Sequence, residues 1–598
     1  MTIIEAVPGA HSQEHFAQKA AQLEKYLTPA GATLADIGRV NLESGDNDWW
    51  RQAVVYQIYP RSFCDANGDG IGDLQGITSK IPYLKRLGID AVWLSPFYPS
   101  SLKDGGYDVA DYRNVDPRIG TLADFDMMMR TFKQSGIKVI VDIVPNHSSN
   151  EHPWFKQALA ADKGSKERAR YHFRDGLGPD KQTPPSDWQS IMGGSAWSPT
   201  GRGDGQFYLH LYDSSQPDLN WSNAEVRHDF VSTLRFWADR GVSGFRVDVA
   251  SGCAKDLSEP FEKWDILKAR RATMIQPGGS TKGLLHPVFD RDEVLSFWRE
   301  WRQILAEYNP PLCAVAEAWV APERKRAYAE ALGQVFAFDI MLCNFDVAQY
   351  KAVIDRQIAA ASDARTSTTW VLSNHDVVRH HTRYGLSDID STNLLTFLAG
   401  FQKYLEHEGR DPVCDAPLGL RRGRAATLMI LALPGSTYLF QGEELGLPEV
   451  PDIPEDCLQD PYYFRNGKKD KGRDGCRVPL PWLKSGHNFG NGHGAPTHLP
   501  QPEWFGGISV QAQESDPHST LQMYRLALSL RKRLQGPETF EWVDLGKCVL
   551  AFKRPGGWLV VLNGGPEDIQ LPSGKILIAS VDITARTLPP NTAAWLQT

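Results

Sequence analysis

Four carboxylates in this sequence follow short apolar runs, which places them at expected strand ends. Asp142 follows KVIV, Asp248 follows GFRV, Glu317 follows LCAVA, and Asp376 follows TWVLSNH. Like charges gathered in one place cost stability unless they are paired or used. The set therefore favours a catalytic site over four separate structural caps, although Asp142 alone could equally brace a neighbouring loop.

Asp248 and Glu317 have the properties that glycoside cleavage needs. One carboxylate attacks the anomeric carbon and a second protonates the leaving oxygen; in retaining enzymes the two lie about 5–5.5 Å apart. Arg246 precedes Asp248 by two residues, so both side chains point to the same face of a strand, and the cation keeps the nucleophile ionised. The apolar neighbours of Glu317 in AVAEAW favour the protonated form that an acid requires.

Eight short apolar runs that alternate with helical segments supply a scaffold for these carboxylates. This alternation predicts an α/β fold, a parallel (β/α)8 TIM barrel, whose active site lies at the C-terminal ends of the strands. The gap between the third and fourth runs is too long for one crossover and predicts an inserted subdomain. The expected strands are residues 54–60, 90–96, 138–146, 244–250, 312–319, 335–340, 369–374 and 436–442.

The chain divides into four predicted parts. The lead-in is polar with helical spacing of its apolar residues, and we assign it no function. Alternating short strands near the C-terminus predict an all-β domain. A long segment after the seventh strand, residues 386–423, could contact the leaving group of a substrate. The parts are 1–47 (N-terminal extension), 48–146 and 216–525 (barrel), 147–215 (inserted subdomain) and 526–598 (C-terminal β-sandwich).

Composition and charge exclude several classes of protein. The 598 residues carry 64 Lys and Arg against 72 Asp and Glu, a net charge of -8. The chain therefore lacks the excess of positive charge that is typical of nucleic-acid-binding proteins. No stretch is long and apolar enough to span a bilayer, and the first residues lack a secretory signal. The 8 cysteines include no C-x-x-C pair, which favours free thiols over a disulfide framework or a zinc site. We therefore expect a cytoplasmic protein without nucleic-acid or membrane partners; its oligomeric state stays open.

The motifs around the carboxylates resemble the main signatures of glycoside hydrolase family 13. They are DIVPNH (142–147), GFRVDV (244–249), AVAEAW (314–319) and SNHDVV (373–378), together with QPDLNW (216–221). The resemblance runs from about residue 49 to the C-terminus. It implies a retaining mechanism on α-glucosidic bonds, with Asp248 as nucleophile, Glu317 as acid/base and Asp376 as transition-state stabiliser.

Within this family the sequence is similar to the α-glucosidase and oligo-1,6-glucosidase branch, and most to an actinobacterial α-glucosidase group. The segments that carry this similarity include GGYDVADY (105–112), GRDGCRVPLPW (472–482) and LSNHDVVRHHTRYG. The resemblance implies that Arg473 pairs with Asp108 and closes the pocket behind the last sugar, which gives exo action on a small oligosaccharide or disaccharide. The residues implied to bind substrate are Tyr107, Asp108, His147, Arg246, Val249, His375, Arg473 and Phe155.

The loop DANGDGIGD (65–73) has oxygen donors at alternate positions, with glycines between them. Carboxylates and an amide suit a hard cation, and Gly permits the tight turn. The twelfth position is not Glu, so the loop is not a full EF-hand, and a solvated turn is the alternative. In related glucosidases this loop resembles a structural cation site. We expect Ca²⁺ or Mg²⁺ and no organic cofactor, with the ligands Asp65, Asn67, Asp69, Ile71 and Asp73.

Two enzyme activities and one binding role remain open. A hydrolase and a transglucosylase share the glucosyl-enzyme and differ only in the acceptor, and a sucrose- or isomaltose-specific member belongs to the same uncertainty. The third possibility is an inactive barrel that serves as a binding subunit, against which the presence of Asp248, Glu317 and Asp376 argues. Val249, directly after the nucleophile, favours α-1,6 cleavage in this branch, whereas the broader match favours α-1,4. We expect α-1,4 cleavage as the main activity and α-1,6 as the secondary one.

Overall fold

Eight parallel strands form the centre of the computed structural model, which describes residues 46–275, 286–386, 389 and 394–598. Their order is β10-β11-β1-β2-β3-β7-β8-β9, and a parallel bridge between Phe336 and Thr369 closes the ring. The predicted barrel is therefore confirmed. The strands are β1 (Val54–Ile58), β2 (Ala91–Leu94), β3 (Lys138–Ile143), β7 (Gly244–Val247), β8 (Cys313–Ala316), β9 (Gln334–Val335), β10 (Thr369–Val371) and β11 (Ser436–Phe440).

The described residues of the barrel and its appendages, 49–598, belong to one compact unit. Residues 1–45, which make up nearly all of the predicted lead-in, lie outside the described residues. No helix of the described ranges is long and apolar enough to cross a membrane. All eight cysteines are described and each is a free thiol, as the sequence predicted.

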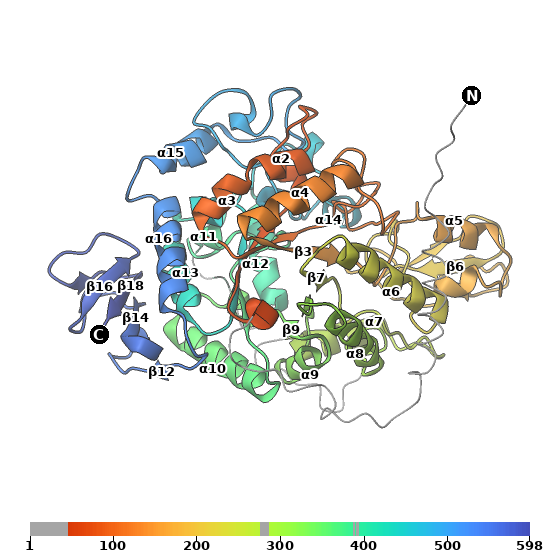
Figure 1. The fold of residues 1–598 in the computed structure, drawn as a ribbon. Coiled ribbons are helices and arrows are strands. Elements are labelled where there is room, and N and C mark those ends of the chain that lie inside the picture. The colour runs from red at the N-terminus through yellow and green to blue at the C-terminus, as the bar shows by residue number, and fades with distance from the viewer. Residues whose placement is uncertain (1–45, 276–285, 387–388, 390–393) are drawn as a thin grey trace. The chain divides into compact units, whose positions relative to one another are not determined.

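Helices surround the barrel (Figure 1). Helix α4 (Leu122–Ser135) begins at a capping box, in which Thr121 and Asp124 satisfy each other's backbone N–H groups. It buries Phe125 and Phe132 on one face, as an amphipathic helix against a core does. Other helices are α2 (Leu74–Ser79), α3 (Ile81–Leu87), α6 (Ala224–Asp239), α7 (Trp264–Ile275), α8 (Glu293–Ala306), α9 (Pro322–Leu332), α10 (Val347–Asp363), α11 (His380–Arg383), α12 (Leu394–Glu406), α13 (Ala416–Ala432), α14 (Pro461–Arg465), α15 (Val510–Glu514) and α16 (Thr520–Leu534).

Side chains along the barrel strands alternate between the barrel interior and the layer beneath the helices. In β1, Val55 belongs to the interior cluster, whereas Val54 and Tyr56 pack in the outer one. In β3, Ile140 lies in the interior, so Asp142, two residues further along, faces inward as well. The alternation thus directs polar side chains near the strand ends into the barrel mouth.

Between β3 and β7 the chain inserts a small antiparallel sheet and a helix. Trp197 and Phe207 of this sheet form a cluster with Trp264 and Leu267 of α7. Helix α7, which follows β7, is therefore packed against the insertion. The inserted elements are α5 (Pro153–Ala160), β4 (Phe173–Asp175), β5 (Trp197–Pro199) and β6 (Gln206–Leu209), with the sheet order β4-β6-β5.

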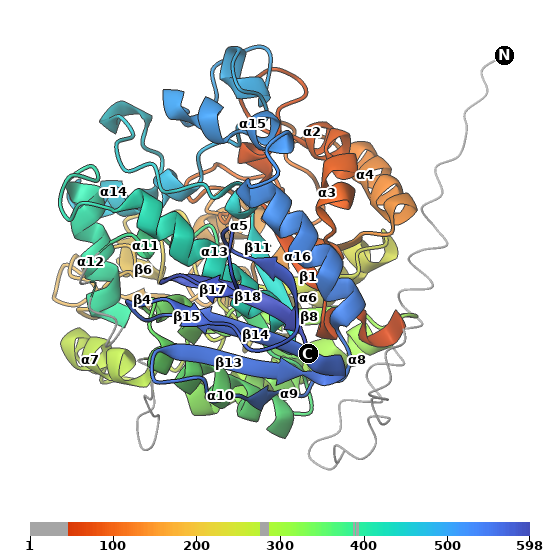
Figure 2. The same cartoon turned by 90° about the vertical axis from the view of Figure 1, so that its left-hand side faces the viewer.

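The C-terminal part is all-β and lies beside α13 and α16 (Figure 2). Its main sheet is antiparallel with the order β12-β13-β14-β18-β16, and β15 pairs with β17. Helix α16 crosses the boundary expected at residue 526, because Leu521, Tyr524 and Leu528 are buried at helical spacing. The strands are β12 (Glu541–Trp542), β13 (Val549–Arg554), β14 (Trp558–Asn563), β15 (Ile569–Gln570), β16 (Lys575–Ala579), β17 (Thr587–Leu588) and β18 (Thr592–Gln597).

Candidate active site

A cavity of about 520 Å³ lies at the C-terminal ends of the barrel strands. Asp248, Glu317 and Asp376 line it, and they follow β7, β8 and β10. This is the end at which (β/α)8 enzymes place their active sites. Five of the residues that the resemblance assigned to substrate line the same cavity, namely Tyr107, His147, Val249, His375 and Arg473.

One guanidinium holds three carboxylates together beside this cavity. Nη1 of Arg246 lies 3.0 Å from Asp142 and 2.5 Å from Asp248, and Nη2 lies 2.9 Å from Glu317. Because one guanidinium contacts both Asp248 and Glu317, their carboxyl groups lie close together, as the two catalytic carboxylates of a retaining glycosidase must. The expected contact between Arg246 and the nucleophile candidate is therefore present.

Asp142 and Asp248 share the positive charge of Arg246, so the protonation of each depends on the other. Burial raises the pKa of Asp142 to about 6, against the opposing effect of Arg246. Burial also raises the pKa of Asp248, and the charges of Glu317 and Asp142 add to that effect, again against Arg246. Asp142 and Asp248 therefore hold a proton more readily than solvent-exposed aspartates do, and Arg246 is the group that favours their ionised forms.

Asp142 braces the site and does not line the cavity. Besides Arg246, its carboxylate accepts hydrogen bonds from the Tyr107 hydroxyl at 2.9 Å and from the Trp93 indole at 3.2 Å. The Tyr107 ring in turn stacks on His375 with ring centroids 5.0 Å apart. Of the two possibilities that the sequence left open for Asp142, bracing is the one that these contacts support.

The surroundings of Glu317 are more polar than its sequence neighbours suggested. Its Oε2 accepts the backbone N–H of Val249 at 2.9 Å, and its Oε1 accepts the Trp319 indole N–H at 3.2 Å. Val249 has a φ of 44°, which β-branched residues rarely adopt and which is found where function requires it. The turn directly after the nucleophile candidate therefore positions the acid/base candidate.

Asp376 lies among positively polarised groups. Nη1 of Arg473 is 3.0 Å and Nη2 of Arg477 is 3.1 Å from its Oδ1, and Nε2 of His375 is 3.3 Å from its Oδ2. Burial opposes ionisation, but His375, Arg473 and Arg477 together lower the pKa of Asp376. The Gln57 amide nitrogen lies 2.8 Å from Nδ1 of His375; an N–H donated there leaves Nε2 to carry the ring proton that faces Asp376. The result is a fixed negative charge in the wall of the cavity.

Arg473 pairs with Asp104, and the expected pairing with Asp108 is wrong. Nη2 of Arg473 lies 2.6 Å from Oδ1 of Asp104, which lines the cavity. Asp108 is fully buried, and its carboxylate accepts the Ser100 hydroxyl at 2.7 Å and the backbone N–H groups of Ser101 and Asp104, each at 3.1 Å. These hydrogen bonds direct the Asp108 side chain toward the backbone of its own loop. Asp108 therefore does not line the cavity and is not placed to contact a sugar there.

Phe155 is a second residue whose expected sugar contact is wrong. It lies on α5, is 1% exposed and does not line the cavity. Its ring packs edge to face against Tyr171 and Tyr208, with centroids 5.1 and 4.9 Å away. Helix α5 directs this side chain into the core and away from the barrel mouth.

Three residues that sequence reasoning missed form or support the wall of the cavity. Asp104 is one; the second is Gln216, whose amide nitrogen lies 2.9 Å from Asp104 and 3.0 Å from His147. The third is Asp460, whose Oδ2 is 2.7 Å from Nε of Arg473. Gln216 begins the QPDLNW motif, so its position was a signal; Asp460 lies in no motif and gave none.

The loop at residues 65–73 folds around its own backbone. Asp65 accepts the N–H groups of Gly68 and Gly70 at 2.6 and 2.9 Å, and Asp73 accepts that of Asn67 at 3.1 Å. Within the described ranges, no three His, Cys, Asp or Glu side chains stand together as metal ligands. The predicted ligands also include the Asn67 amide and the Ile71 carbonyl, which are not among these side-chain types. A calcium or magnesium site in this loop therefore stays a prediction.

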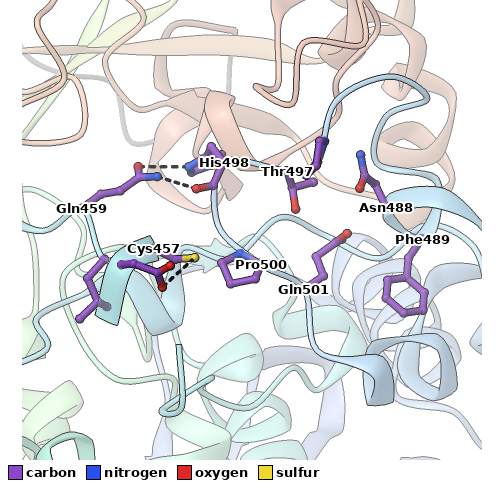
Figure 3. Close-up of a pocket in the computed structure, with 11 residues that line it drawn as sticks. Cys457, Gln459, Asn488, Phe489, Thr497, His498, Pro500 and Gln501 are labelled. Atoms are coloured by element: carbon purple, nitrogen blue, oxygen red, sulfur yellow. Dashed lines mark hydrogen bonds between the residues drawn. The ribbon is translucent and has the colours of Figure 1, made fainter. Parts of the chain in front are cut away.

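A second cavity of about 530 Å³ lies beside residues 456–459 and 488–501 (Figure 3). Asp456 is the single acid that lines it, and no Lys or Arg does. The Gln459 side chain is bonded to His498, so it is not free for a ligand. Among the described residues, this second cavity lacks the two carboxylates that paired acid/base chemistry needs. The cavity at the barrel mouth is therefore the candidate active site.

Comparisons with known proteins agree with this geometry. The family described as "Alpha amylase, catalytic domain" matches residues 57–404 and 415–536. The chain is 35% identical to a probable alpha-glucosidase of Rhizobium meliloti (86% of this chain, 88% of the relative) and 33% identical to an oligo-1,6-glucosidase of Parageobacillus thermoglucosidasius (81% and 84%). Among solved structures, an alpha-glucosyl transfer enzyme, XgtA, superposes with a TM-score of 0.75 at 32% identity (92% and 99%).

Proposed function

We propose that this chain, which belongs to the α-amylase family of glycoside hydrolases, is a retaining α-glucosidase that releases glucose from the non-reducing ends of short α-glucosides. Asp248 attacks the anomeric carbon and forms a glucosyl-enzyme, while Glu317 protonates the leaving oxygen. Glu317 then deprotonates the incoming water. Asp376, held ionised by its cationic neighbours, stabilises the positive charge of the transition state.

One observation carries the exo-acting part of this proposal: Arg473 bridges Asp104 and Asp376 inside the cavity. The same guanidinium contacts Asp460, so carboxylates hold it on several sides. A sugar chain that extended past the glucose would have to displace this ion-paired group. The cleaved glucose is therefore the last residue of the chain, with Tyr107 and His375 beside it.

For the linkage we propose α-1,4 bonds as the main substrate and α-1,6 bonds as a secondary one. The two relatives named above include both a probable alpha-glucosidase and an oligo-1,6-glucosidase, at nearly equal identity. Val249 lines the cavity next to Glu317, on the side of the leaving group. A single side chain of this size shifts selectivity by about 1–3 kcal/mol, which alters a ratio of activities without abolishing either.

The experiment is a time course with maltose, isomaltose, sucrose and trehalose, resolved by chromatography and by proton NMR. We expect α-glucose as the first-formed anomer and maltose as the preferred substrate. First-formed β-glucose would refute the retaining mechanism, and internal cleavage products from longer maltosides would refute exo action. A kcat/KM for isomaltose tenfold above that for maltose would reverse the linkage preference.

A second candidate is transfer of glucose to a sugar or alcohol. The similarity to the solved alpha-glucosyl transfer enzyme favours it, and the chemistry up to the glucosyl-enzyme is the same. The same time course tests it at high substrate concentration. Each transfer to a second maltose releases one glucose and forms one trisaccharide, so trisaccharide that forms in step with glucose would indicate transfer. Two glucose molecules per maltose consumed would indicate hydrolysis.

A further inference from the structure

Helix α7 presents one continuous face to the active-site cavity. Trp264, Lys268, Arg271 and Ile275 all line the cavity, and they recur at spacings of four, three and four residues along the helix. Residues at these spacings lie on one side of an α-helix. The middle of this face therefore carries two cations, one helical turn apart.

Arg271 has no counter-ion within the described part of the chain. It forms no salt bridge there, and its buried Nε has no hydrogen-bond partner. Its guanidinium carbon lies 3.9 Å above the Phe289 ring, which orients the planar group without neutralising it. Lys268 is exposed and likewise forms no ion pair with a described residue. An unsatisfied guanidinium in a partly buried position costs free energy unless a ligand satisfies it.

The other charged side chains that line the cavity have ion-pair or hydrogen-bond partners. Arg473 lies between Asp104 and Asp376, and the catalytic carboxylates share the guanidinium described above. The remaining acids, Glu449 and Asp470, accept the backbone N–H groups of Arg379 and Gly472. Burial raises the pKa of both, that of Glu449 to about 7. Within the described residues, Arg271 and Lys268 of α7 are therefore the cations of the cavity lining that have no ion-pair partner.

This positive charge lies on the side where the leaving group departs. Burial lowers the pKa of Arg271, and the groups that act against this effect are Tyr212, Tyr462 and Glu317. Ile275, one helical turn beyond Arg271, packs in the same cluster as Trp319, whose indole N–H binds Glu317. Glu317 protonates the leaving oxygen in the proposed mechanism, so this part of α7 borders the side of the cavity where the leaving group departs.

We propose that Arg271 and Lys268 select α-glucosides whose leaving group carries an anion, a carboxylate or a phosphate. A guanidinium recognises either group with two parallel hydrogen bonds, and the ammonium adds a point charge. Arg271 is then a specificity-determining residue. This inference rests on the proposed α-glucosidase function, because it names the substrate class of that same site.

The test compares substrates that differ in charge and little in shape. Maltobionate and maltitol are both glucose α-1,4-linked to an open-chain polyol, and only maltobionate carries a carboxylate. A disaccharide of glucose α-linked to glucose 6-phosphate, paired with its phosphate-free form, tests phosphate as the source of the anion. We expect wild-type kcat/KM to favour the anionic member of at least one pair by about tenfold or more, and the preference to shrink as salt is added.

The variant Arg271→Gln should abolish this preference, because it should lower kcat/KM for maltobionate far more than kcat/KM for maltitol. Arg270→Gln is the matched control: it makes the same change on the same helix, but Arg270 pairs with Glu262 at 2.5 Å and does not line the cavity. A preference that survives Arg271→Gln, or equal losses on the charged and neutral substrates, would overturn the proposal.

A binding measurement separates this inference from the proposed function. Calorimetry with the Asp248→Asn enzyme reports the affinities for maltobionate and maltitol without catalysis. Tighter binding of maltobionate, lost in Asp248→Asn/Arg271→Gln, would support anion selection even if wild type hydrolysed neither substrate. Equal affinities, together with equal hydrolysis rates of the two, would refute anion selection and leave the glucosidase proposal intact.

Discussion

The ion pair between Asp104 and Arg473 predicts which of two nearby aspartates binds the terminal glucose. Asp104→Asn keeps the size of the side chain and removes its charge. It weakens the 2.6 Å contact with Arg473 and the 2.9 Å hydrogen bond from Gln216. A hydrogen bond to a charged group contributes about 1.5–3 kcal/mol, so kcat/KM should fall by about 10- to 150-fold. Arg473 keeps Asp460 at 2.7 Å, so the melting temperature should change little.

Asp108→Asn is the matched control, because it makes the same change four residues along the chain. Its amide would place N–H groups opposite the Ser101 and Asp104 N–H groups that now bond the carboxylate. We therefore expect a lower melting temperature and near-normal kcat/KM at low temperature. The assays are hydrolysis of 4-nitrophenyl α-glucoside and of maltose, with differential scanning fluorimetry. If Asp108→Asn lost more activity than Asp104→Asn while folded, the geometric assignment would be refuted.

Four further predictions follow from the same structure. Asp248→Asn should lower kcat by several orders of magnitude at an unchanged melting temperature, and a tenth of the activity remaining would exclude it as nucleophile. Glu317→Gln should hydrolyse maltose very slowly but keep activity on aryl glucosides with good leaving groups; equal losses in the glycosylation step would contradict its role. The loop at 65–73 should bind one calcium ion through oxygens at about 2.3–2.6 Å, with chelation lowering the melting temperature more than the activity, and a crystal structure grown with calcium that shows the loop empty would remove the hypothesis. Burial raises the pKa of Glu443 to about 8, so the folded state keeps a proton that the unfolded state releases; stability should fall as pH rises from about 5 to 8, and Glu443→Gln should flatten this profile by on the order of 2–4 kcal/mol, which chemical denaturation at several pH values measures.

The sequence was sufficient to predict the barrel because each strand carries its own signal. Runs such as KVIVDIV are too short and too rich in β-branched residues for helices, and helical segments separate them. The sixth run, 335–340, shows the limit of this signal. There the strand is reduced to Gln334–Val335, and residues 338–342 form a 3-10 helix, so a largely apolar stretch did not reveal where extended backbone ends. The domain boundary expected at residue 526 falls inside α16 for a similar reason. The helical spacing of buried apolar residues continues through that position.

In the active site, contacts between strand residues could be predicted from the sequence, whereas contacts made by loop residues could not. The contact between Arg246 and Asp248 was predicted correctly because an offset of two residues along a strand returns a side chain to the same face. The partner of Arg473 was not, because a loop has no such parity. Asp104 and Asp108 lie in one glycine-containing turn, and Asp104 is 369 residues from Arg473 in the sequence. Both aspartates are therefore plausible partners when only the sequence is known. What decides between them is which carboxylate the loop's own N–H groups bond: they bond Asp108, and this leaves Asp104 for the arginine. The choice is made by backbone hydrogen bonds that appear only once the loop is folded, so single substitutions at these two positions are the most direct probe of how this chain builds its glucose pocket.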